Sequence, residues 1–284
     1  MRVVITGATG NVGTSVIDAL AAEPQVSEVV SIVSASPTTG VIGLVSMSLA
    51  GSGANIDSFD SGVGPYGSSN QGNAANVLSN GSITLNGAKV HGGVRSTQSS
   101  VILKRLSLVT GDVTAGTKIS NAGTINGTAT PFAPSSAIVA PAVAACSPFS
   151  GTTGIGGQFK YAAATGDLSV VNGKTATLAN GSYCFHNITL ASGSVLQVTG
   201  PVAITLTGKL SDKGTLANLT FVPANLRISS SYTGNSGIAL VGGNSAYLTV
   251  YAPGTSVALS GGGPLFGTLL GKTLADSATL VPGA

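Results

Sequence analysis

The stretch that decides the fold is LANGSYCFHNITLASGSVLQVTGPVAITLTGKL, residues Leu178 to Leu210. Apolar side chains recur at every second position in short bursts, and each burst ends at Gly, Asn, Ser or Pro. The bursts are Tyr183 and Phe185, Ile188 and Leu190, Leu196 and Val198, and Val202, Ile204 and Leu206. A period of two, interrupted by turn residues, predicts strands of about four to six residues.

The spacing of these strands limits the fold class. The bursts restart about every eight to ten residues, which leaves no room for crossover helices and disfavours a doubly wound sheet. A β-sandwich, a barrel and a solenoid remain. Gly contributes 41 of 284 residues and charged residues only 7%, so Ser, Thr, Asn and Gly must cover the surface. Such small residues stack well on the outside of a coil and turn its corners. We therefore predict a mainly β protein, a parallel β-helix (solenoid).

Charge and hydropathy exclude several classes of function. The net charge of +3 is spread thinly, and Lys104-Arg105 is the only adjacent basic pair, which predicts no binding of nucleic acid. No window offers about 18 consecutive apolar residues, so we expect no integral membrane segment. The N-terminus does not have the apolar region of a secretory signal peptide, which leaves a cytoplasmic location open.

The first 33 residues follow a different pattern. Met1 to Thr6 is an apolar strand, the loop TGATGNVG follows, residues 12–22 have helical spacing, and Val29 to Val33 is a second strand. Gly7, Gly10 and Gly13 have the spacing that lets a backbone turn sharply and approach a pyrophosphate. This Rossmann-like β-α-β fragment resembles the opening of the extended short-chain dehydrogenase and NAD-dependent epimerase family. The resemblance implies NAD or NADP bound at these glycines.

The fragment departs from that family in two ways. The acidic ribose-binding residue is replaced by the sequence Ser34-Ala35-Ser36, and no Tyr is followed four positions later by Lys. Strand and helix also stop alternating after Val33, so only one unit of a nucleotide-binding sheet is present. Two alternatives are that the helix caps an open end of the solenoid, and that residues 1–33 derive from a gene fusion or a misplaced start.

The rest of the chain carries a second resemblance. After a linker at residues 34–45, the phrases IDSFDSGVGPYG, SNGSITLNGAKVHGGV, the opening stretch quoted above and YAPGTSVALSGGGPLFGTLLGKTL occur in that order. Residues 46–284 thereby resemble the uncharacterised β-helical domain of bacterial pilus-assembly and envelope surface proteins. The resemblance implies an extracellular or cell-envelope location, with other envelope or pilus proteins or surface glycans as partners.

A Pro-rich excursion at about residues 130–150 divides the predicted solenoid, because proline cannot donate to a strand ladder. It contains Cys146, which lies 38 positions before Cys184. The two cysteines do not have metal-ligand spacing. In an oxidising compartment they would form a bridge, and the alternative is two buried thiols.

Candidate sites are few. Asp57 and Asp60 form the closest pair of carboxylates and predict either a Ca²⁺ site or two turn caps. Catalysis on a β-helix would require convergence of the separated Asp112, Asp167, Asp212 and Asp276, and His91 and His186 are isolated. An outward threonine ladder would suit ice or carbohydrate; its members are Thr177, Thr189, Thr199, Thr205 and Thr207.

We therefore expect a non-enzymatic bacterial surface or pilus-associated β-solenoid that acts as a structural or adhesive module. The first alternative is an NAD(P)-binding oxidoreductase or epimerase-like protein. The second is a carbohydrate-binding or carbohydrate-processing β-helix.

Overall fold

The computed structural model describes residues 2–6, 28–32, 40–51, 53–148, 151–241, 245–261 and 263–281. The chain divides into two compact units, residues 1–36 with 139–141, and residues 37–138 with 142–284. In the first unit β1 (Arg2–Thr6) pairs in parallel with β2 (Glu28–Ile32), and both strands lie where the sequence predicts them. The predicted helix at residues 12–22 and Gly7, Gly10 and Gly13 lie outside the described residues.

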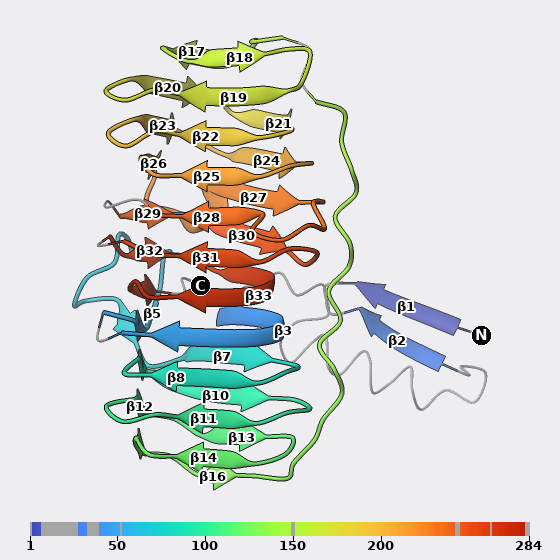
Figure 1. Ribbon diagram of the computed structural model, residues 1–284, viewed down its shortest axis with the longest axis vertical. Helices are drawn as coiled ribbons and strands as arrows, with labels where there is room; N and C mark the ends of the chain where they lie inside the picture. Colours follow the sequence, from blue (N-terminus) through green and yellow to red (C-terminus); the bar gives the residue numbers. More distant parts are fainter. Residues whose placement is uncertain are drawn as a thin grey trace. The chain divides into compact units, whose positions relative to one another are not determined.

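The second unit is a β-solenoid, which confirms the predicted fold class. Each coil passes through three short strands, and most strands pair in parallel with their equivalents in the next coil (Figure 1). The exceptions are β17 and β18, which pair antiparallel to β20 and β19, and β26 and β29, which belong to different sheets. Three ladders of strands therefore run along the stack. The third of these consists of a four-stranded and a seven-stranded sheet.

The first ladder holds the longer strands. From one end of the stack to the other, its members are β21 (Gly181–Phe185), β24 (Val202–Leu206), β27 (Leu226–Ser230), β30 (Thr249–Ala252), the first part of β33 (Leu269–Asp276), the first part of β3 (Gly40–Ala50), β7 (Ala75–Ser79), β10 (Gly92–Ser96), β13 (Val113–Ala115) and β16 (Ala129–Thr130).

The second ladder adjoins the first across a corner of the coil. Its members are β18 (Lys160–Ala162), β19 (Asp167–Val170), β22 (Ile188–Leu190), β25 (Leu210–Asp212), β28 (Ile238–Leu240), β31 (Val257–Leu259), the second parts of β33 and β3, β8 (Ile83–Asn86), β11 (Val101–Leu103) and β14 (Ile119–Asn121).

The third ladder closes each coil. Its members are β17 (Ile155–Gly157), β20 (Thr175–Leu178), β23 (Val195–Val198), β26 (Thr215–Asn218), β29 (Ala246–Tyr247), β32 (Leu265–Phe266), β34 (Leu280–Val281), β4 (Asn55–Ile56), β9 (Lys89–Val90), β12 (Leu108–Val109) and β15 (Thr124–Ile125). A hairpin of β5 (Ser58–Phe59) and β6 (Gln71–Gly72) and a 3-10 turn η1 (Pro223–Asn225) lie between ladder strands.

The order of the coils along the stack does not follow the chain. Residues 40–130 wind from the middle of the stack to one end, whereas residues 155–281 wind from the other end back to the middle (Figure 1). The halves meet where β3 pairs with β33 on one side and with β7 and β8 on the other. β3 begins at Gly40, within the range that the sequence assigns to a linker.

The Pro-rich excursion forms a strap, residues 131–148, that connects the two ends of the stack (Figure 1). It holds no regular secondary structure. The amide N–H groups of Phe132 and Ser135 donate to the carbonyl oxygens of Thr117 and Thr97 at 2.6 and 3.0 Å. Farther along, Cys146 is bonded to Cys184 of β21, with a Cα–Cα distance of 6.0 Å. The structure thus selects the bridge over two free thiols.

Asn80 attaches the strap to the N-terminal half of the solenoid. Its amide donates to the Ile138 carbonyl oxygen at 2.8 Å, and its own oxygen accepts the Ile138 N–H at 2.6 Å. Replacing Asn80 with alanine removes both bonds, and we expect a loss of about 1–2 kcal/mol of local stability. Limited proteolysis should then cut residues 131–138 faster. Asn86→Ala, at another Asn-Gly corner, serves as the control, and equal cleavage of both variants would contradict this role.

Alternation of the side chains explains the core. Inward positions carry Val, Ile and Leu, and most are fully buried in one continuous cluster. Corners need residues that tolerate unusual backbone angles or close approach. Gly173 of the Asn172-Gly173 pair has φ of 69°, and a Cβ on Gly81 would lie 1.7 Å from the Val45 carbonyl oxygen.

Candidate functional site

Asp57 and Asp60 lie in the excursion that leaves the coil after β4. Asp57 is buried, and its carboxylate accepts hydrogen bonds from the Ser58 N–H at 2.8 Å, the Tyr66 hydroxyl at 2.8 Å and the Gln71 amide. Asp60 accepts the Gly62 N–H at 2.8 Å, which is the turn-capping bond that the sequence suggested as the alternative. Ca²⁺ requires about six to eight oxygen ligands, and no cluster of three or more His, Cys, Asp or Glu suitable for a metal occurs within the described ranges. The Ca²⁺ site stays a prediction.

The same excursion folds over outward aromatic side chains of the third ladder. Phe59 contacts Tyr66, Tyr247 and Phe266 edge to face, with ring centroids 5.8–6.2 Å apart. Tyr247 stacks on Phe266 at 4.4 Å. Phe221, which is half exposed, meets the edge of Tyr247 at 5.4 Å. Such contacts stabilise by about 0.5–1.5 kcal/mol per pair beyond burial, so this cluster fixes the excursion on the coil.

Tyr66 connects the aromatic cluster to Asp57. Burial, assisted by its hydrogen bond to Asp57, raises the pKa of the Tyr66 phenol to about 12. Tyr66→Phe leaves the ring in place but deprives the buried carboxylate of a donor. We expect a loss of about 1–2 kcal/mol in the free energy of unfolding, measured by urea denaturation at pH 7. Tyr232→Phe is the control, and a Tyr66→Phe protein as stable as the native one would contradict the assignment.

Asp212 and Asp276 occupy one inward column of the second ladder. In register, this column reads Val170, Leu190, Asp212, Leu240, Leu259, Asp276, Leu49, Leu85, Leu103 and Asn121. The other members of this column are six leucines, Val170 and Asn121. Three coil spacings separate them, or about 14 Å at ~4.8 Å per strand. That distance exceeds the ~5–9.5 Å between the paired carboxylates of glycosidases.

Each of these acids closes a turn. Asp212 accepts the Gly214 N–H at 2.8 Å, and Asp276 accepts the Ala278 N–H at 2.7 Å. The second oxygen of Asp276 is buried without a hydrogen-bond partner. Burial raises the pKa of Asp212 to about 6 and that of Asp276 to about 7, although the turn hydrogen bonds act in the opposite direction.

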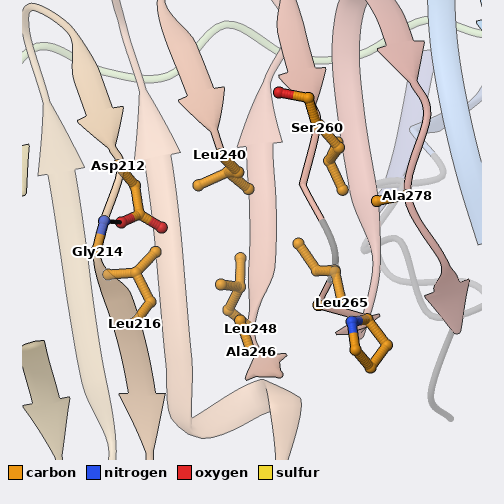
Figure 2. Close-up of a pocket in the computed structure, with 12 residues that line it drawn as sticks. Asp212, Gly214, Leu216, Leu240, Ala246, Leu248, Ser260, Leu265 and Ala278 are labelled. Atoms are coloured by element: carbon orange, nitrogen blue, oxygen red, sulfur yellow. Dashed lines mark hydrogen bonds between the residues drawn. The ribbon is translucent and has the colours of Figure 1, made fainter. Parts of the chain in front are cut away.

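A small cavity lies beside Asp212 (Figure 2). Leu216, Leu240, Leu248 and Leu265 line it together with Gly214. Its volume of about 30 Å³ matches about two or three water molecules, because a single water needs about 10–15 Å³ measured in this way. The cavity therefore accommodates solvent next to the carboxylate but is too small for a sugar or a nucleotide.

Among the remaining sequence candidates, Asp167 and His186 lie near each other, because Asn187, which follows His186, binds the Asp167 carboxylate. The Asp112 carboxylate accepts a hydrogen bond from the Thr128 N–H at 2.7 Å. The Asp167 carboxylate accepts hydrogen bonds from the Thr165 hydroxyl and from both the backbone N–H and the side-chain amide of Asn187. Those bonds, led by the one from Thr165, lower the pKa of Asp167. His91 follows β9, and the Nδ1 of His186 lies 3.1 Å from the Thr207 hydroxyl. The side chains of Asp112, Asp167 and His186 thus each form a hydrogen bond at a corner of the coil.

The prediction of one outward threonine ladder is wrong, because its members do not lie on a single surface. Thr177 belongs to the third ladder, Thr189 to the second and Thr205 to the first, because consecutive strands of one coil face different directions. The true outward column of the second ladder consists of small uncharged residues with one isoleucine. It reads Ser169, Thr189, Ser211, Ala239, Ala258, Ala275, Ser48, Thr84, Ile102 and Ser120.

Sequence reasoning missed the alignment of Asp212 with Asp276 and the aromatic cluster. A local signal existed for the two acids, since each ends a strand at an apolar position and precedes a turn. No local signal existed for the aromatic cluster, whose members Phe59 and Phe266 are far apart in sequence.

Comparison with protein-family models, curated proteins and solved structures finds no match for this chain. Across the described residues, no helix has both the length and the apolar character needed to cross a membrane.

Proposed function

We propose that the chain is a non-enzymatic, structural or adhesive β-solenoid of a bacterial cell surface or pilus. The observation that carries this proposal is the construction of the second unit, a stack of parallel coils to which the strap is attached by hydrogen bonds from Asn80 to Ile138 and by the Cys146–Cys184 disulfide. Disulfides persist in oxidising, extracytoplasmic compartments, which supports a location outside the cytoplasm.

The outward column of the second ladder supports an adhesive role. Its ten residues follow one another at the ~4.8 Å spacing of paired strands, and all are half-buried or exposed. A flat surface without charge suits contact with neutral glycans or with other envelope proteins through close packing. Ala258, in the middle of this column, is exposed.

The proposal is tested in two steps. In intact cells that produce the chain, surface proteolysis and thiol alkylation should show an accessible protein with Cys146 and Cys184 oxidised; a protected, reduced chain would refute a surface location. The purified protein should then bind an envelope fraction or a glycan array. Ala258→Arg should weaken that binding at least tenfold, while Ala203→Arg, an exposed site in β24, should not.

A second candidate function is NAD(P) binding by the first unit. The observation that favours it is the parallel pairing of β1 with β2, because parallel neighbours require a crossover connection, as the nucleotide-binding unit has. Titration of the full chain with NAD(H) and NADP(H) by calorimetry tests it. Micromolar binding lost in Gly10→Val would support the candidate, and no heat up to millimolar concentration would remove it.

A further inference from the structure

One end of the solenoid consists of the end coil, residues 119–130, which contains β14, β15 and β16 (Figure 1). These strands pair with β11, β12 and β13 of the preceding coil. Within the described part of the chain, no strand pairs with their other edge. The end coil therefore presents backbone donors and acceptors along three sides of the coil, and such edges are templates for pairing with another chain.

The hydrophobic core is open at this end. In the preceding coil the inward side chains Val101, Leu103, Val109 and Val113 are at most 2% exposed. Their register partners in the end coil are, in order, Ile119, Asn121, Ile125 and Ala129. Of these, the two isoleucines are only half-buried, and Asn121 and Ala129 are exposed. Inward positions that remain accessible are what a further layer would cover.

The opposite end is built differently. There β17 and β18 run antiparallel to β20 and β19, so the parallel winding stops at a closing layer. Phe159 and Tyr161 pack against the core at that end, and the Tyr161 ring lies 6.1 Å from that of Phe185. The exposed Lys160 adds a charge to the last strand, which is a usual protection of a strand edge.

The end coil has no comparable protection. Residues 119–130 contain no charged residue and no proline. Charges of opposite sign stand at the rim, namely Lys118 and the Asp112 carboxylate that accepts the Thr128 N–H. Phe132, directly after β16, is 75% exposed. Although the chain carries a net charge of +3, two copies can meet through this face with little like-charge repulsion. A neutral edge with apolar centres suits an identical surface better than a charged partner.

We propose that the end coil is a self-association surface at which two copies of this chain meet end to end about a two-fold axis. Two coils that face each other in this way wind in opposite senses, so all three facing strand pairs are antiparallel, a favourable arrangement for short strands. The contact joins Ile119, Ile125 and Ala129 of both copies into one apolar layer. Because the paired strands have only two or three residues, the dimer is weak and reversible. This inference does not depend on the proposed surface function.

The test uses the full chain at several concentrations, from about 5 μM to 1 mM, the range expected for weak interfaces. Sedimentation velocity should show a monomer–dimer equilibrium. Ala129→Lys introduces a charge at an exposed position and should weaken dimerisation at least tenfold, whereas Ala203→Lys, the same change at an exposed position of β24 near the opposite end of the stack, should leave it unchanged. Amide hydrogen exchange should slow in residues 119–130 as the concentration rises.

Three results would overturn the proposal. They are a monomer at every concentration, a dimer that responds equally to both substitutions, and open-ended oligomers that indicate head-to-tail contact. Circular dichroism and unchanged exchange in the central coils establish that Ala129→Lys is folded, so a loss of the dimer reports on the interface.

Discussion

Replacing Asp276 with asparagine is expected to raise the free energy of unfolding at pH 8 by about 1–3 kcal/mol. Burial raises the pKa of this carboxyl from 3.8 to about 7, and each pH unit corresponds to about 1.4 kcal/mol, so ionising it in the folded state costs about 4 kcal/mol. Asparagine stays neutral and can still accept the Ala278 N–H. Its buried NH₂ group cancels part of the gain, since an unpaired donor costs about 1–3 kcal/mol.

The sign of the pH dependence follows from the raised pKa. Between pH 3.8 and about 7 the folded state holds a proton at Asp276 that the unfolded state has lost, so stability declines as the pH rises through this window. Asp212, with a pKa of about 6, acts in the same direction. In urea unfolding, the stability of Asp276→Asn relative to the native protein should therefore rise from pH 4 to pH 8.

Asp60→Asn is the matched control for this measurement. Asp60 closes the same kind of turn with the Gly62 N–H at 2.8 Å, but it is exposed. Replacing Asp60 should change the free energy of unfolding little at pH 4 or at pH 8. If Asp276→Asn were less stable than the native protein at pH 8, the burial of an ionisable group would not be the controlling effect.

Removing the bridge between Cys146 and Cys184 is expected to lower the free energy of unfolding by about 4 kcal/mol. The bridge closes a loop with a sequence separation of 38, and loop-closure entropy for about 40 residues gives roughly this value. Double replacement by alanine should lower the urea midpoint and should match the reduced, alkylated native protein. Cleavage in residues 142–148 should also accelerate because the strap loses its attachment to β21.

The disulfide experiment has its own internal check. Reducing agent should not shift the midpoint of the double alanine variant, whereas it should shift that of the native protein. Equal midpoints for the oxidised and reduced native protein would mean that attaching the strap does not stabilise the part of the solenoid that contains β21.

Strand positions were predictable from the sequence because burial imposes a period of two on every coil. The quoted stretch from Leu178 to Leu210 yields β21, β22, β23 and β24 close to the expected bursts. The corners were predictable as well, since Asn-Gly pairs stand at strand ends in both halves. The turn cap at Asp60 follows from the same local chemistry.

The order of the coils was not predictable from local pattern. Every coil repeats the same alternation, so nothing in the sequence of β3 specifies β33 as its neighbour. The same limit hid the common column of Asp212 and Asp276 and the spread of Thr177, Thr189 and Thr205 over three ladders. Both features depend on the number of residues per coil, and this number varies because the turns between strands differ in length.

The meeting of β3 with β33 has a consequence for how the protein is made. Residues 269–281 supply the partners of β3 and β4, and they are synthesised long after β3. Until then the N-terminal half displays an unpaired edge at β3, as well as the one at β16. Synthesis of residues 269–281 must precede closure of the central layer, so a chaperone or a translocation channel that shields residues 40–56 would suppress premature aggregation.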